Sequence, residues 1–275
     1  MPHFDRIRPA ALIVIIAFFI LHVVLNALNN LVLFQSSLYD PLTIATSGLI
    51  NATLQANVLM LVILVGGVLM AWGKLCPPDF GLIWSGLPRA ALLTVVIWLI
   101  VQGVLMLIAA ANGLPITLDA TWTQFGVAPV LGALIRQVFG NALFEEIGYR
   151  GFMLPQAYLR LNIRQRWLRV IAALLISQLL FALIHLPSWI ANGQDILANA
   201  PRVMMLGIFF ALFYLVTGNI FLSIGVHALG NRPTPLVAAP GVDSSLLVLA
   251  VSLIILIGLW LWQRRAAAHS LSVAG

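Results

Sequence analysis

The chain has 275 residues, of which 62% are hydrophobic and 8% charged, and its mean hydropathy is +1.06. This makeup excludes an ordinary soluble domain and is typical of a polytopic membrane protein. The formal charge of +6 does not indicate nucleic acid as a partner, because the basic residues neither cluster with aromatic side chains nor form a soluble face.

Apolar stretches of about 20 residues, each long enough to span a bilayer, recur along the sequence. No linker or low-complexity tract divides them, so we predict an all-α membrane helix bundle that forms a single domain over residues 1–275. The eight predicted helices cover residues 10–34, 54–72, 89–111, 128–157, 168–187, 202–217, 219–231 and 244–263. The first is too long for a signal peptide and lacks a small-residue cleavage pattern. The seventh is too short to cross a hydrocarbon layer of about 30 Å, which favours a half-helix packed inside the bundle.

Positive charge in the connections falls mostly on one side of this scheme. Only Arg202 and Arg232 occupy connections on the other side. The residues on the basic side are Arg6, Arg8, Lys74, Arg89, Arg160, Arg164, Arg166, Arg169, Arg264 and Arg265. The positive-inside rule therefore predicts that both termini are cytoplasmic. We expect an integral protein of a bacterial-type plasma membrane, in contact with the lipid bilayer.

Ionisable side chains within predicted spans are costly, and they usually face the bundle interior and serve a function there. Glu145 and Glu146 are the only glutamates of the chain, and Arg150 follows them on the fourth helix. His185 lies near the end of the fifth helix, and His227 with Asn231 on the seventh. These segments carry the candidate site.

Spacing predicts how these groups relate to one another. Glu145 lies 15 residues before Arg160 and His185 lies 16 residues after Arg169, so both are about 22 to 24 Å from the basic connection at about 1.5 Å per residue. His227 and Asn231 are four residues apart and share one helical face. Glu146 lies four residues before Arg150, the favoured spacing for an intrahelical ion pair.

Taken singly, these residues also have structural interpretations. The Glu146–Arg150 pair is expected to be structural, because pairing lowers the cost of a charge in the membrane. A lone histidine or asparagine commonly joins membrane helices by a hydrogen bond. His22, with Asn26, Asn29 and Asn30, forms a polar stripe on the first helix, and we interpret it as structural because no carboxylate is near in sequence. The joint occurrence of a glutamate, two histidines and an asparagine favours a function.

Three motifs occur in one order along the chain. E-E-x-x-x-R covers residues 145–150, F-x-x-x-H covers residues 181–185 and H-x-x-x-N covers residues 227–231. Together they resemble the motifs of the CAAX-protease and bacteriocin-processing (CPBP) family of intramembrane proteases, which includes the prenyl-protein endopeptidase that trims farnesylated CAAX proteins. The resemblance covers about residues 75–235, the expected protease core. It implies an intramembrane endopeptidase whose substrate is a membrane-associated or lipidated protein or peptide.

The resemblance also implies catalytic roles. Glu145 would be the general base that activates a water molecule, and His185 would help to hold that water. His227 and Asn231 would donate hydrogen bonds to the oxyanion. Spacing, and not the resemblance, assigns supporting roles to Glu146 and Arg150. It also makes Asn141, one turn before Glu145, the candidate for a supporting partner of the catalytic side chains. All four catalytic side chains are expected to line one cavity.

Two alternatives stay open at this stage. Two histidines and a carboxylate could bind zinc with an open position for water. No H-E-x-x-H motif occurs, and the single cysteine, Cys76, excludes a cysteine-based metal site, so a mechanism without a cofactor or metal is favoured. The second alternative is a membrane transporter, or a bacteriocin-immunity or binding protein, that uses the same polar groups without catalysis. Nothing in the sequence indicates an oligomeric state.

Overall fold

The computed structural model describes residues 4–273 of the chain, and within that range the regular secondary structure is helical, apart from one isolated backbone bridge between Leu118 and Val237. Seven helices are long and apolar enough to cross a membrane, and one shorter apolar helix covers Ile220–Asn231. The prediction of an all-α membrane bundle is confirmed, and the protein is an integral membrane protein by this criterion.

The seven spans differ from the predicted ranges mainly at their ends. They cover Leu12–Gln35, Ala52–Trp72, Trp84–Ala111, Val127–Arg160, Arg166–Ala191, Ile196–Thr217 and Ser244–Ala266. The sixth begins six residues earlier than predicted because the Asp195 side chain accepts hydrogen bonds from the amides of Leu197 and Ala198 and so caps the helix. Pro201 lies inside this helix and does not end it.

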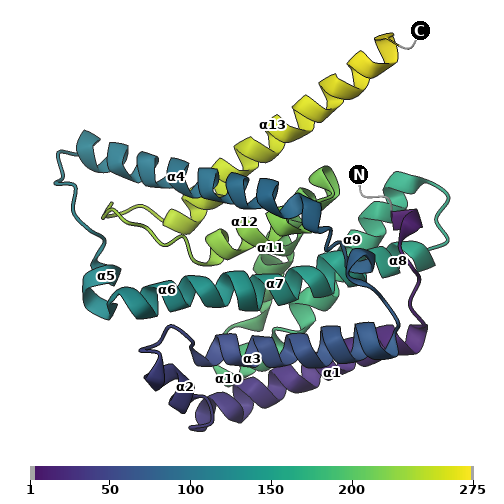
Figure 1. Ribbon diagram of the computed structural model, residues 1–275, viewed down its shortest axis with the longest axis horizontal. Helices are drawn as coiled ribbons and strands as arrows, with labels where there is room; N and C mark the ends of the chain where they lie inside the picture. The colour runs from purple at the N-terminus through teal and green to yellow at the C-terminus, as the bar shows by residue number, and fades with distance from the viewer. Residues whose placement is uncertain (1–3, 274–275) are drawn as a thin grey trace.

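The helices of Figure 1 divide these spans as follows: α1 (Leu12–Leu31), α3 (Ala52–Met60), α4 (Leu87–Ala111), α6 (Val127–Arg136), α7 (Ala142–Glu145), α8 (Leu154–Arg160), α9 (Arg166–Leu183), α10 (Leu186–Ala191), α11 (Ile196–Thr217) and α13 (Ser244–Val273). The shorter apolar helix outside the spans is α12 (Ile220–Asn231). Two short helices, α2 (Asp40–Ala45) and α5 (Ala120–Phe125), lie in the connections. The 3-10 turns cover Phe4–Arg6, Leu33–Gln35, Pro77–Phe80 and Trp84–Gly86.

The fourth span changes helical geometry four times along its length. Two π-helical segments, Gln137–Asn141 and Glu146–Met153, separate α6, α7 and α8. A third π-helical segment, Leu61–Trp72, continues α3. Segments of this kind occur most often at functional sites. Glu145 is the last residue of α7 and Glu146 the first of the following π-helical segment, so the two glutamates lie at a change of geometry.

The fourth span lies between two groups of helices (Figure 1). On one side α4, α11, α12 and α13 share an apolar cluster that includes Ile97 and Phe213. On the other side α1 and the span that begins with α3 share a second cluster, which includes Phe18 and Leu64. Both clusters include residues of the fourth span, Ala142 in the first and Phe144 in the second. Opposite faces of this span therefore pack against different groups of helices.

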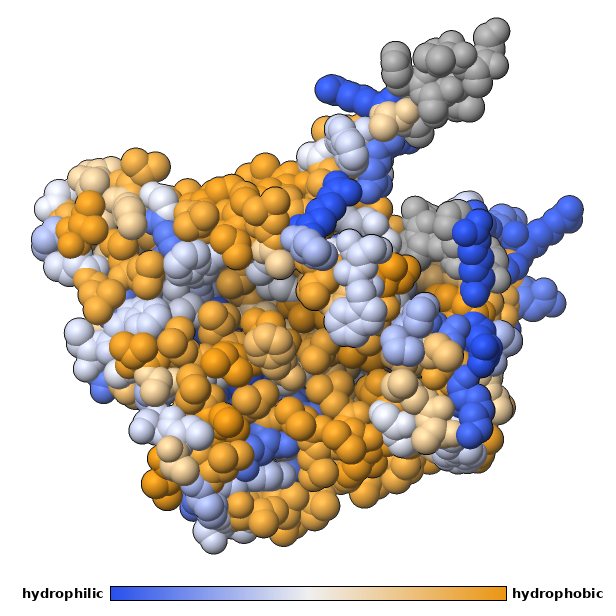
Figure 2. All heavy atoms as spheres, in the orientation of Figure 1, coloured by the Kyte–Doolittle hydropathy of each residue, from blue (hydrophilic) through white to orange (hydrophobic). Residues whose placement is uncertain are grey.

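The connections predicted to be basic meet at one end of the bundle. The Arg8 side chain donates to the carbonyl of Lys74 at 2.6 Å, and Arg160 donates to the carbonyl of Ala10. Arg89 at the start of α4 lies over the Trp262 ring of α13, 5.5 Å from its centroid. Figure 2 shows strongly hydrophilic side chains projecting at this end, while apolar side chains cover most of the visible face.

Helix α12 confirms the predicted half-helix. Its residues from Ile220 to Leu229 are buried, so it is enclosed by the bundle and not by lipid. The Asn219 side chain caps its first turn and also donates to the carbonyl of Gly86 at 2.8 Å, which ties the start of α12 to the start of α4. His227 is thereby held at a fixed depth inside the protein.

Candidate active site

Glu146 and Arg150 form the ion pair that their spacing predicts. Both side chains have no exposed surface, and Arg150 Nη1 lies 3.2 Å from Glu146 Oε1. This contact does not meet hydrogen-bond geometry, so it is an electrostatic pairing. Arg150 also donates through Nη2 to the carbonyl of Gly207 at 3.0 Å and lies over the Phe181 ring. Gly207 permits this approach, since a Cβ there would come within 3.0 Å of Arg150 Nη2.

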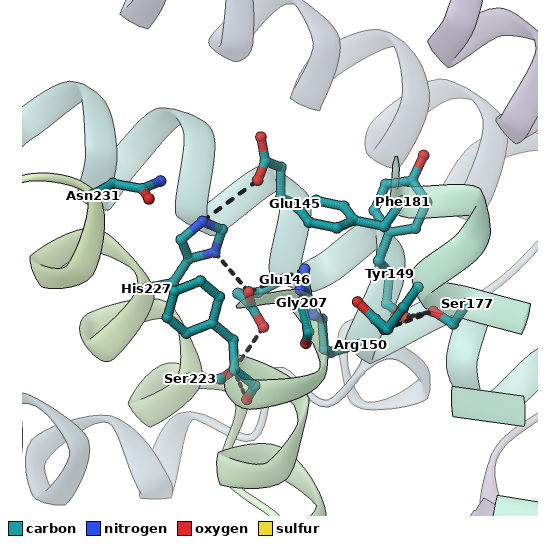
Figure 3. A network of polar contacts seen from close by, with 12 residues as sticks. Glu145, Glu146, Tyr149, Arg150, Ser177, Phe181, Gly207, Ser223, His227 and Asn231 are labelled. Carbon is teal, nitrogen blue, oxygen red and sulfur yellow. Dashed lines mark hydrogen bonds and ion pairs between the residues drawn. The ribbon is translucent and has the colours of Figure 1, made fainter. Parts of the chain in front are cut away.

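His227 lies between the two glutamates (Figure 3). Its Nδ1 is 2.7 Å from Glu146 Oε1, and its Nε2 is 3.6 Å from Glu145 Oε2. The ring stacks on Phe210 with centroids 4.2 Å apart. Ser223, one turn before His227 on α12, donates to Glu146 Oε2 at 2.6 Å. The imidazole of His227 therefore lies between the fully buried carboxylate of Glu146 and the partly exposed carboxylate of Glu145, with Phe210 packed against its face.

The hydrogen bond to Glu146 assigns the tautomer of His227. A carboxylate beside an arginine is an acceptor, so the proton of this bond is on Nδ1. The neutral ring then presents an unprotonated Nε2 to Glu145. Only the imidazolium form can donate a hydrogen bond toward Glu145 or toward a substrate oxygen near it. The gap of 3.6 Å is longer than a direct hydrogen bond, so a proton passes between the two groups only through a bridging water or after they approach each other.

Glu145 and His185 line a common cavity of about 260 Å³. The Glu145 side chain is 14% exposed, whereas that of Glu146 is fully buried, so the two adjacent carboxylates have different environments. His185 is oriented through Nδ1, which is 2.8 Å from the carbonyl of Phe181 one turn earlier. This leaves Nε2 of His185 as the nitrogen available to a water molecule or substrate. Asn141 lines the same cavity and accepts a hydrogen bond from Asn57 at 2.6 Å.

His227 and Asn231 do not belong to the lining of this cavity. His227 reaches Glu145 from within the protein, as described above. Asn231 is exposed at the end of α12, where Figure 3 shows its side chain apart from both glutamates. Its amide donates to Gln137 Oε1 at 3.2 Å. The expected arrangement of four side chains around one cavity is therefore present for Glu145 and His185 and differs for the other two.

Three residues of this network were not predicted from sequence. Ser223 completes a run of polar residues at intervals of four with His227 and Asn231, a spacing visible in the sequence. Tyr149 donates its hydroxyl toward His22 or accepts from it, at 2.9 Å from His22 Nδ1. His22 also lines the cavity that holds Glu145. The polar stripe on the first helix thus lines the cavity that holds Glu145. Its distance from Glu145 in sequence gave no indication of this contact.

Zinc was the alternative considered from sequence. Among the residues that the structure describes, no group of three or more histidine, cysteine, aspartate or glutamate side chains is arranged to hold a metal ion. The donor set does not fit a three-ligand zinc site with an open position, because His185 lines the cavity beside Glu145 whereas His227 contacts Glu145 from outside that lining.

Glu145, Glu146, Arg150 and His227 all lie within a segment that matches a known protein family. Residues 127–232 match the family model described as Type II CAAX prenyl endopeptidase Rce1-like. These residues form an Rce1-like domain. No curated protein and no solved structure matches the chain. The resemblance inferred from the three motifs is confirmed, and the family is one of peptidases.

The Rce1-like domain extends from α6 to the end of α12. It contains both glutamates, Arg150 and the two histidines of the motifs. The cavity is not contained in it, however. His22 and Asn26 of α1 and Asn57 of α3 form one wall, and all three lie outside the matched residues. The site is therefore built by the family domain together with the first two spans.

Proposed function

We propose that the chain is an intramembrane endopeptidase that hydrolyses a peptide bond of a membrane-associated or lipidated protein. One observation supports this above the others. Glu145 is open to a polar cavity and lies 3.6 Å from a histidine that a second, fully buried glutamate orients. A carboxylate with an adjacent oriented imidazole is suited to move protons between water and a substrate nitrogen.

The reaction begins with a water molecule between Glu145 and His185. Glu145 takes a proton from this water, and His185 orients the water through a hydrogen bond at Nε2. The water oxygen attacks the carbonyl carbon, which becomes tetrahedral and places negative charge on the carbonyl oxygen. Glu145 then gives its proton to the leaving nitrogen, the C–N bond breaks, and a carboxylic acid and an amine are released. General acid–base catalysis of this kind typically contributes about 10²- to 10⁴-fold.

The oxyanion requires donors, and His227 is the first candidate. It can donate through Nε2 only as the imidazolium, because Nδ1 already donates to Glu146. In that form the ring lies beside Glu146, which also faces Arg150. Asn231 would have to release Gln137 to donate its amide. A single oxyanion donor is worth about 3 kcal/mol in known cases.

The proposed setting is a bacterial-type plasma membrane with both termini in the cytoplasm. The partners of the protein are then the bilayer and a membrane-bound polypeptide. The grouping of the basic connections at one end supports this orientation.

The test uses purified full-length protein in detergent with a panel of membrane peptides, prenylated and unprenylated. Glu145→Gln should abolish cleavage while the protein stays folded by thermal unfolding and gel filtration. Asp40→Asn is the matched control, since it makes the same change at an exposed carboxylate of α2 and should leave activity unchanged. Retained cleavage in folded Glu145→Gln protein would refute the proposed base.

A further inference from the structure

The wall that faces Glu145 across the cavity is rich in carboxamides. Helix α1 contributes Asn26 and Asn30 beside His22, and α3 contributes Asn57. Asn57 donates through Nδ2 to Asn141 Oδ1 at 2.6 Å and to the carbonyl of Thr53 at 2.8 Å. This pair of amides spans the gap between the second and fourth spans, next to the candidate base.

Several polar atoms of this wall stay available. Within residues 4–273, Asn57 Oδ1 and Asn141 Nδ2 make no hydrogen bond, and neither does Nε2 of His22, whose Nδ1 is bound to Tyr149. None of these atoms is among the fully buried polar atoms that lack a partner, so they face the cavity space. The Asn57–Asn141 pair therefore presents one acceptor and one donor side by side.

This pattern matches the backbone of an extended polypeptide. A substrate strand inside a membrane leaves its N–H and C=O groups without water, and each unsatisfied group costs several kcal/mol. A carboxamide offers both a donor and an acceptor, so paired asparagines can bind a peptide unit whatever its side chain. Hydrogen bonds to the main chain of a peptide give affinity that does not depend on its side chains.

We propose that Asn57 and Asn141 form a subsite that binds the backbone of an extended substrate beside the scissile bond. The subsite rests on the proposed peptidase function and adds to it a positioning element from outside the Rce1-like domain. Because the contact exists equally in the bound substrate and in the transition state, its loss should raise KM and leave kcat nearly unchanged.

The test compares amide and ester substrates. Asn57→Leu should raise KM about tenfold, which corresponds to about 1.4 kcal/mol, with kcat within about twofold. Gln55→Leu is the matched control on α3, because Gln55 bonds to Tyr39 and Thr43 away from the cavity. A substrate series in which one backbone N–H at a time is replaced by an ester oxygen should contain one position that weakens binding to wild type and not to Asn57→Leu.

Two outcomes would overturn the subsite. One is an unchanged KM in folded Asn57→Leu, and the other is an ester effect of the same size in wild type and variant at every position. If Asn57→Leu does not fold, Asn141→Leu tests the other half of the pair. It removes the donor Nδ2, so KM should again rise while the ester effect at the acceptor Asn57 Oδ1 persists, and an unchanged KM in folded Asn141→Leu would overturn the subsite. All of these results differ from failure of the peptidase function itself, which would show as inactive wild-type protein.

A second inference concerns the side from which substrate enters. Asn30 and Phe34 lie at the end of the first span, Thr53 at the start of the second and Ser188 near the end of the fifth, and all four line the cavity. These span ends are opposite to the ends that join the basic connections. We infer that the cavity opens on the extracytoplasmic face and that, for a peptidase, the substrate segment comes from that side.

The orientation of the cavity can be tested by cysteine labelling, for which the single cysteine is an internal reference. Cys76 is exposed in the connection between the second and third spans, on the basic side. In intact cells a membrane-impermeant maleimide should not label wild-type protein until the cells are permeabilised. The Cys76→Ser/Ser188→Cys protein should be labelled without permeabilisation. The reverse pattern, or no labelling of Ser188→Cys under either condition, would overturn the inference, and neither result bears on cleavage in detergent.

Discussion

The separation of roles between the two glutamates predicts a large difference in stability between two matched variants. Glu146→Gln removes the negative charge that faces Arg150 and leaves a guanidinium with no exposed surface and no counter-ion. Breaking a buried ion pair by removing one partner costs about 3 to 5 kcal/mol. Glu145→Gln changes a side chain that is 14% exposed and whose nearest ionisable neighbour, Nε2 of His227, is 3.6 Å away, and we expect a cost of less than about 1 kcal/mol.

The measurement is reversible unfolding of both variants in mixed micelles, with the yield of monodisperse protein as a second readout. A difference of about 3 kcal/mol corresponds to more than about 100-fold in the ratio of folded to unfolded protein. The double variant Glu146→Gln/Arg150→Met is the control for mechanism. It removes both charges and should recover most of the loss, because replacing a buried pair by an apolar side chain is often neutral.

Stabilities of Glu146→Gln and Glu145→Gln that agree within about 1 kcal/mol would contradict the structural role of the buried ion pair. A double variant less stable than Glu146→Gln alone would contradict it as well. In that second case the Arg150 bond to the Gly207 carbonyl, and not the charge pair, would be the stabilising contact.

Three further predictions follow from the same geometry. Gly207→Ala should reduce folded yield because its Cβ would clash with Gln178 Oε1 and crowd the guanidinium of Arg150, whereas Gly103→Ala, with open space around it, should not. Equal yields would show that α11 shifts to accommodate the methyl group. Elemental analysis of active protein should find zinc below one atom per chain, and a tightly bound zinc whose removal and return switch activity off and on would reverse the mechanism. Reporter fusions after Gly193 and after Gln263 should lie on opposite sides of the membrane, and the same side for both would contradict the helix arrangement.

Much of the fold was predictable because each span carries its own signal. Length and hydropathy identify a membrane helix without reference to its neighbours. The half-helix was also predictable, since residues 219–231 are apolar and too short to span a bilayer. The start of α11 was not, because the Asp195 cap extends the helix beyond the apolar segment.

The candidate site was predictable where one helix holds both partners. Glu146 and Arg150 are four residues apart, so their pairing follows from helical geometry. The contact of His227 with Glu146 joins helices 81 residues apart in sequence, and only the packing of α12 against the fourth span decides which glutamate the ring prefers. His22 was interpreted as structural for the same reason, since its proximity to Glu145 arises from tertiary contacts.

The π-helical segments of the fourth span also affect how related sequences should be compared. Each such segment accommodates an extra residue within a helical turn, so it can be gained or lost by a single insertion or deletion without breaking the helix. A relative that lacks the segment Glu146–Met153 would be one residue shorter between its glutamates and the basic connection. Alignments that forbid gaps inside membrane spans would then shift α8 by one position, and they would pair Gln156 and Arg160, which bind the N-terminal segment here, with the wrong residues.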